Sequence, residues 1–173
     1  DWATRFRSYL VNKAGVPAAN ITVLSGDAQF SDGLVTGEAT PDTITGTVRE
    51  LAGKLKSADQ FVLALFGHSS AAGGDVKYVF RGPDLPLGAL AGALKSIRSG
   101  NQVVLDFTPA SGVALQTYAA ENRVVVAATS VDEDAESVFA EFLLRGLESG
   151  RADGEGAPAA GRKDGTVSLV EAY

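Results

Sequence analysis

Three short and almost unbroken apolar runs constrain the fold of this chain more than any other feature. They cover residues 61–66, 102–107 and 123–129, and helical patterns lie between them. Unbroken apolar strands are typical of a parallel sheet that is covered on both faces. Because strands that alternate with helices form right-handed βαβ crossovers, we predict a three-layer α/β/α domain with a mostly parallel sheet.

Periodicity and capping residues predict the remaining elements. Trp2, Phe6 and Leu10 recur at helical spacing and indicate a helix over about residues 2–14. Thr40 is a suitable N-cap, and Pro41 fits the first position of the helix that follows. A further helix is expected through Leu87, Leu90, Leu94 and Ile97, and Ser99-Gly100 ends it. Two more helices are expected over 113–121 and over roughly 132–148. Short strands are expected over 21–24 and 76–80, and loops over 25–39 and 69–75.

Composition excludes several classes of function. The net charge is −6 and no basic cluster occurs, so nucleic acid is not an expected partner. No apolar run has the length of a membrane span, and membrane insertion is not expected. The absence of cysteine excludes disulfides, thiolate metal sites and cysteine nucleophiles. The first residue is Asp1, which suggests a processed form or a fragment, and the compartment stays open.

Polar residues follow the first two apolar runs. His68 is the only histidine and lies between Gly67 and Ser69 after the first run, and Asp106 ends the second. Functional groups of open parallel sheets collect at the carboxyl ends of strands, so we expect His68 to lie close to the turn at 106–112. A lone histidine is often structural or exposed, and Asp106 also fits a loop cap, so both interpretations stay open.

The turn at 106–112 reads Asp-Phe-Thr-Pro-Ala-Ser-Gly and carries two hydroxyls, those of Thr108 and Ser111. Ser111-Gly112 fits an ordinary helix start, because serine is a preferred N-cap and glycine permits unusual backbone angles. The functional alternative is an oxyanion or carboxylate cradle at a helix N-terminus. The α/β-hydrolase, Walker A and dinucleotide motifs are missing, so no cofactor is expected and a flavodoxin-like ligand binder is a weaker interpretation.

The C-terminal segment 164–171 matches the second half of an EF-hand calcium loop. Gly165 stands at the turn position, Ser168 at the ninth and Glu171 at the twelfth. The first and third ligand positions fall on Ala160 and Arg162, which offer no carboxylate. We therefore predict a degenerate segment that holds no metal, preceded by a polar linker over 150–165.

Together these motifs resemble those of caspase/legumain-like cysteine peptidases, and more closely those of uncharacterised bacterial relatives of legumain-type peptidases. In that family, His-Gly follows one strand and Asp-x-Cys-x-Ser-Gly follows the next. The resemblance covers most of the chain, from about residue 2 to the end. The matching segments are 67–69, 81–85, 104–106, 110–112, 123–129 and 164–172.

The departures from the family decide what the resemblance implies. Ser69 replaces the glycine of His-Gly, and the cysteine position falls on Thr108 or on Pro109, depending on the end from which the turn is counted. The family's fold also begins with a strand before the first helix, which this sequence would lack. The resemblance implies a caspase-like domain over residues 1–150 with a vestigial site (His68 with the 106–112 turn), followed by the degenerate segment at 151–173.

We therefore expect a catalytically inactive pseudo-peptidase that binds a protein or peptide partner or has a structural role. The alternative is a cysteine-independent hydrolase with His68 as the base. Its nucleophile would be Thr108 or Ser111, which is a far weaker nucleophile than a thiolate until a base is positioned beside it. That alternative needs a hydroxyl oxygen within hydrogen-bonding reach of a His68 nitrogen.

Overall fold

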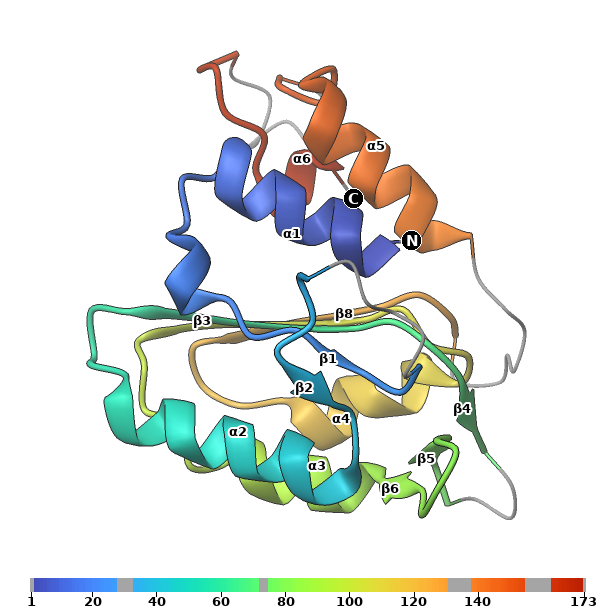
Figure 1. The fold of residues 1–173 in the computed structure, drawn as a ribbon. Helices are drawn as coiled ribbons and strands as arrows, with labels where there is room; N and C mark the ends of the chain where they lie inside the picture. Colours follow the sequence, from blue (N-terminus) through green and yellow to red (C-terminus); the bar gives the residue numbers. More distant parts are fainter. Residues whose placement is uncertain (1, 28–32, 72–74, 131–137, 155–162, 173) are drawn as a thin grey trace. The chain divides into compact units, whose positions relative to one another are not determined.

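A computed structural model of the chain describes residues 2–27, 33–71, 75–130, 138–154 and 163–172 (Figure 1). The chain forms two compact units. The sheet unit consists of residues 23–137, and the helical unit combines residues 1–22 with residues 138–173.

The sheet unit is organised around three parallel strands in the order β3-β7-β8. They are β3 (Gln60–Leu65), β7 (Asn101–Asp106) and β8 (Arg123–Ala127). Leu65 pairs with Asp106, which in turn pairs with Ala127, so the three carboxyl ends meet at one edge. The predicted parallel pairing of the three apolar runs is confirmed, and the chain is an α/β protein.

Three helices cover one face of this sheet (Figure 1). They are α2 (Pro41–Lys54), α3 (Leu87–Leu94) and α4 (Ala114–Tyr118). Thr40 and Thr43 form a capping box at the start of α2, as the sequence predicted for Thr40. Val48 of α2, Leu90 of α3 and Val104 of β7 are buried in one apolar cluster, so this face holds the core of the unit.

The opposite face of the sheet is not buried along its whole length. Val62 is 38% exposed and Val124 is 54% exposed, although both lie inside predicted buried strands. The expectation of strands enclosed throughout is therefore wrong at their amino-terminal halves. β-branched residues favour strands for conformational reasons also, so an apolar run alone does not establish burial on both faces.

Five further strands of two residues each complete the sheet unit. β1 (Leu24–Ser25) pairs in parallel with β2 (Gly37–Glu38), and β2 lies inside the stretch 25–39 that we expected to be a loop. β5 (Lys77–Tyr78) lies between β4 (Ser69–Ser70) and β6 (Leu85–Pro86) in an antiparallel sheet. The strands expected over 21–24 and 76–80 are thus shorter, and the first is shifted by three residues at its start.

Two helices of the sheet unit are shorter than predicted. α3 ends at Leu94, because Ser96 and Ile97 donate to the carbonyls of Ala93 and Leu94 and tighten the chain into turns. The helix expected over 113–121 begins as the 3₁₀ turn η3 (Ser111–Val113), continues as α4 and ends at Tyr118. A short connection then leads from Tyr118 to the start of β8 at Arg123.

The helical unit contains α1 (Trp2–Asn12), η1 (Ala18–Asn20), α5 (Phe139–Ser149) and α6 (Leu169–Ala172). Arg5 of α1 forms ion pairs with Glu141 and Glu148 of α5. Gly146 lets α6 approach α5, because a Cβ at this position would lie 3.4 Å from Ala172. The predicted helix over 132–148 matches α5 from residue 139 onward; residues 131–137 lie outside the described part. In the described ranges, no helix is long and apolar enough to span a membrane.

Candidate functional site

The candidate site lies where β3 and β7 end. The Phe107 N–H donates to the Leu65 carbonyl over 3.0 Å and extends the pairing of the two strands by one residue. The rings of Phe66 and Phe107 stack with centroids 4.8 Å apart and planes inclined by 10°. The segments that lead to His68 and to the 106–112 turn therefore leave the sheet side by side.

His68 is exposed and belongs to the turn from β3 into β4. Gly67 has a φ of +146°, a backbone conformation that side-chain-bearing residues rarely adopt, so glycine makes this turn possible. The His68 carbonyl accepts a 3.0 Å hydrogen bond from the Val79 N–H. The backbone of His68 is thus fixed next to β5, and the residue is exposed to solvent.

Asp106 is the centre of a buried hydrogen-bond network that we call the Asp106 network: Tyr78, Asp106, Thr108 and Tyr118. The Tyr78 hydroxyl donates to Asp106 Oδ2 over 2.7 Å and lies 2.6 Å from the Tyr118 hydroxyl. Thr108 donates to Asp106 Oδ1 with both its N–H, over 3.1 Å, and its hydroxyl, over 2.7 Å. All four residues are at most 5% exposed, so the network is closed to solvent.

Burial dominates the protonation equilibria of this network. The pKa of Asp106 is raised above its ordinary value because burial disfavours the carboxylate, although hydrogen bonds from Tyr78 and Thr108 act in the opposite direction. Burial also raises the pKa values of Tyr78 and Tyr118, and the charge of Asp106 adds to both shifts. Both tyrosines therefore stay neutral and act as hydrogen-bonding groups.

Ser69 lies beside this network without taking part in it. It is 1% exposed and pairs with Tyr78 across the β4–β5 sheet, so the two side chains share one face. Its hydroxyl oxygen has no hydrogen-bond partner within the described part of the chain. A buried unpartnered hydroxyl is costly, which makes Ser69 the one unsatisfied side chain in the described surroundings of the network.

The hydroxyl of Ser111 holds the end of β8. Its Oγ accepts hydrogen bonds from the N–H groups of Ala128 and Thr129, over 3.0 and 3.2 Å, and lies 3.1 Å from the Thr129 hydroxyl. Ser111 is buried, as is Gly112. Ser111 is the first residue of η3 and the N-cap position is Ala110, so the Ser111 hydroxyl connects the turn to the segment after β8 instead of occupying the cap.

Ala110 gives the turn its unusual path. Its φ of +57° is left-handed, a region that alanine rarely adopts and that glycine would enter without cost. Pro109 precedes it, and both residues are buried. Across this left-handed residue, Ser111 reaches the N–H groups that follow β8, while Thr108 remains hydrogen-bonded to Asp106.

The structure thus places Asp106 with Thr108, and Ser111 with Thr129, as two buried groups of hydrogen bonds, while His68 is exposed. The sequence analysis missed Tyr78 and Tyr118. Each tyrosine lies in an apolar context, Tyr78 in a short strand and Tyr118 on a helix face. That pattern could have indicated a hidden polar partner, because a buried phenol needs one. A buried acid at the end of β7 is such a partner.

The C-terminal segment uses its carboxylates internally. Asp153 accepts hydrogen bonds from the N–H groups of Asp164 and Gly165, over 3.0 and 3.1 Å. Glu171 accepts from the Gly154 N–H over 3.0 Å and from both the N–H and the hydroxyl of Ser168, over 2.7 and 2.8 Å. These bonds, from the Ser168 N–H foremost, lower the pKa of Glu171 below its ordinary value.

We expect calcium to leave the melting temperature of the protein unchanged. Glu171 and Asp164, at the twelfth and fifth positions of that loop, already accept hydrogen bonds from backbone N–H groups, and binding of an ion would break those bonds. Ala160 and Arg162, the residues at the first two ligand positions, lie outside the described part and carry no carboxylate. Thermal unfolding with and without millimolar calcium checks this; a saturable rise in melting temperature would show that other oxygens complete a site.

Among the described residues, no group of three or more histidine, aspartate or glutamate side chains is arranged to hold a metal ion. No family model matches the chain, and no curated protein is significantly similar to it.

Proposed function

We propose that this chain is a catalytically inactive α/β domain of the caspase/legumain-like kind. In this proposal it is a pseudo-peptidase that binds a protein or peptide partner or has a structural role. The chain has no cysteine, so the thiolate chemistry of that family is excluded. The resemblance rests on short motifs, and the inactivity rests on the state of the two hydroxyls in the 106–112 turn.

The observation that carries the proposal is the enclosure of both candidate nucleophiles. Thr108 is 2% exposed and Ser111 is 1% exposed, so a peptide carbonyl has no access to either oxygen. The proton of the Thr108 hydroxyl is directed to Asp106, and the Ser111 oxygen accepts two backbone N–H groups. A nucleophile needs a free lone pair that faces the substrate, which neither arrangement offers.

The rim above the buried network supports a binding role. His68 is exposed, and Val79, its neighbour across the β4–β5 pairing, is 40% exposed. An imidazole beside an exposed valine is a small surface with both polar and apolar character, as peptide-binding surfaces commonly are. We place the contact with a partner at this rim.

We also propose that the fold has the three layers that the resemblance implies. The face of the sheet opposite α2, α3 and α4 carries Val103, Leu105 and Val126, and the last two are buried. A sheet with apolar side chains on both faces is typical of architectures in which both faces are covered. A third layer would lie over the carboxyl-terminal half of this face.

A peptidase assay tests the inactivity. The purified chain is incubated with fluorogenic peptides ending in Arg, Lys, Asp or Asn, and we expect no turnover above the buffer rate. Turnover that disappears in His68→Ala and also in Thr108→Ala or Ser111→Ala would overturn the proposal and establish the cysteine-independent hydrolase. Turnover that survives these substitutions in a preparation that mass spectrometry shows to be free of other proteins would also overturn the inactivity.

A further inference from the structure

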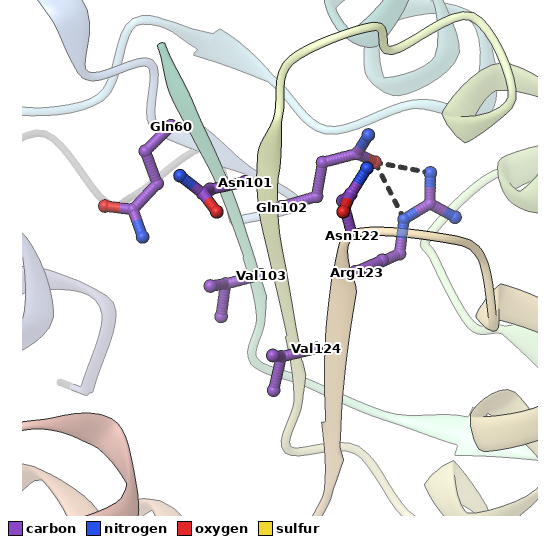
Figure 2. A pocket seen from close by; sticks show the side chains of 7 residues that line it. All are labelled: Gln60, Asn101, Gln102, Val103, Asn122, Arg123 and Val124. Carbon is purple, nitrogen blue, oxygen red and sulfur yellow. Dashed lines mark hydrogen bonds between the residues drawn. The ribbon is translucent and has the colours of Figure 1, made fainter. Parts of the chain in front are cut away.

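The opposite edge of the β3-β7-β8 sheet carries a hollow that the proposed function does not use. It lies at the amino-terminal ends of the strands and has a volume of about 360 Å³, within the range of small-molecule sites. All of its residues belong to the sheet unit (Figure 2). Its lining consists of Gln60, Asn101, Gln102, Val103, Asn122, Arg123 and Val124.

Three exposed carboxamides line this hollow. Gln60 on β3 pairs with Asn101 on β7, and Asn122 directly precedes β8. Adjacent strands of a sheet lie about 4.8 Å apart, so the carboxamides of Gln60 and Asn101 are neighbours, while that of Asn122 lies nearer to Gln102 (Figure 2). Asn122 has a φ of +61°, so its carboxamide stands at a turn where asparagine is tolerated better than most residues.

The hollow presents no charged group to a ligand. Arg123, the only ionisable residue of the lining, points to the other side of the sheet with Gln102, and Figure 2 shows the two hydrogen bonds between them. Val103 and Val124 point to the same side as Asn101 and supply apolar surface (Figure 2). The lining thus combines neutral groups that donate and accept hydrogen bonds with two valines.

We propose that this hollow binds a small neutral sugar. A carboxamide offers an NH₂ donor and a carbonyl acceptor next to each other, and two neighbouring hydroxyls of a sugar satisfy both, one donating and the other accepting. The valines pack against the C–H face of the ring. A charged ligand would lose hydration without gaining a counter-charge. This inference goes beyond the proposed function and holds whether or not the 106–112 turn is catalytic.

Nuclear magnetic resonance of the ¹⁵N-labelled chain tests the proposal. The side-chain NH₂ signals of Gln60, Asn101 and Asn122 are followed during titration with glucose, galactose, mannose and N-acetylglucosamine. We expect saturable shifts of these signals with at least one sugar, and none at Gln116, an exposed carboxamide on α4. Gluconate, a charged relative of glucose, should bind at least tenfold more weakly.

Two substitutions remove carboxamides without disturbing the fold. Asn122→Gly keeps the left-handed turn and deletes the amide, and Asn101→Leu replaces an exposed side chain. We expect each to weaken sugar binding on the order of tenfold, as the loss of one or two hydrogen bonds does, while Gln116→Leu leaves it unchanged. Lack of a saturable shift with all four sugars, equal shifts at Gln116, tighter binding of gluconate, or unchanged binding by both variants would each overturn the proposal.

Discussion

Replacement of Asp106 by alanine is expected to lower the free energy of unfolding by about 2–4 kcal/mol. The substitution removes the acceptor for the Tyr78 hydroxyl and for both donors of Thr108, which remain buried. Each donor left without a partner costs about 1–3 kcal/mol, although the Tyr78 hydroxyl retains its contact with Tyr118. Urea unfolding followed by circular dichroism measures the difference.

Two matched variants separate the network from the loss of a charge. Asp106→Asn keeps the shape and an acceptor oxygen for Thr108, and its amide can donate to the Tyr78 oxygen, so we expect a loss of about 1 kcal/mol. Asp75→Ala removes an exposed carboxylate and should stay within about 0.5 kcal/mol of the parent chain. Equal losses for Asp106→Ala and Asp75→Ala would contradict a structural role for the network.

The same carboxyl makes a prediction about pH. The pKa of Asp106 is raised in the folded chain, chiefly by burial, so the folded state binds this proton more tightly than the unfolded state does. The stabilising contribution is therefore complete below the unfolded pKa, about 3.9, and is lost as the pH rises through the higher folded pKa. We expect the stability advantage of the parent chain over Asp106→Asn to shrink as the pH rises from about 3.5 to 7 in parallel urea titrations.

The sheet was predictable because its evidence is local. Residues 61–66, 102–107 and 123–129 are apolar runs separated by helical patterns, and that order implies parallel neighbours. The two-residue strands β2, β4 and β6 were not predicted, and β1 and β5 were predicted only with wrong bounds, because two residues carry no alternation to detect. The exposure of Val62 and Val124 was equally hidden, since strand propensity and burial favour the same residues.

The site was predictable only in part because its contacts are distant in sequence. The pairing of Leu65 with Asp106 at the ends of β3 and β7 followed from the rule that parallel strands bring their carboxyl ends together, and the closeness of His68 to the 106–112 turn stays a prediction. The partners of Asp106 did not follow: Tyr78 is 28 residues away from it, and Tyr118 is 40 residues from Tyr78. The sequence suggested that Ser111 caps a helix, whereas its hydroxyl accepts from Ala128 and Thr129. The left-handed conformation of Ala110, which precedes Ser111, cannot be recognised from a serine-glycine pair.

Replacement of Arg123 by alanine is the second substitution expected to have a large effect. The guanidinium donates to the Gln102 carboxamide oxygen over 2.6 and 2.9 Å, and to the backbone carbonyls of Tyr118 and Leu94 over 2.8 and 2.9 Å. It thus ties the last residues of α3 and α4 to the sheet. We expect a loss of about 2–4 kcal/mol in the free energy of unfolding, because these acceptors lose their donor in a partly buried site.

The hydrogen bonds of Arg123 and Gln102 also predict how the stabilities of several variants rank. Gln102 donates to the carbonyls of Ser99 and Ile97 and accepts from Arg123, so each side chain helps to hold the other in place. The double variant Arg123→Ala, Gln102→Ala should therefore lose less free energy of unfolding than the two single variants lose together. Arg123→Lys keeps the charge with fewer donors and should fall between the parent chain and Arg123→Ala. Arg49→Ala, at an exposed position of α2, is the control and should change stability by less than about 0.5 kcal/mol. Additive losses at Arg123 and Gln102 would mean that the two side chains act independently, against the hydrogen bonds that join them.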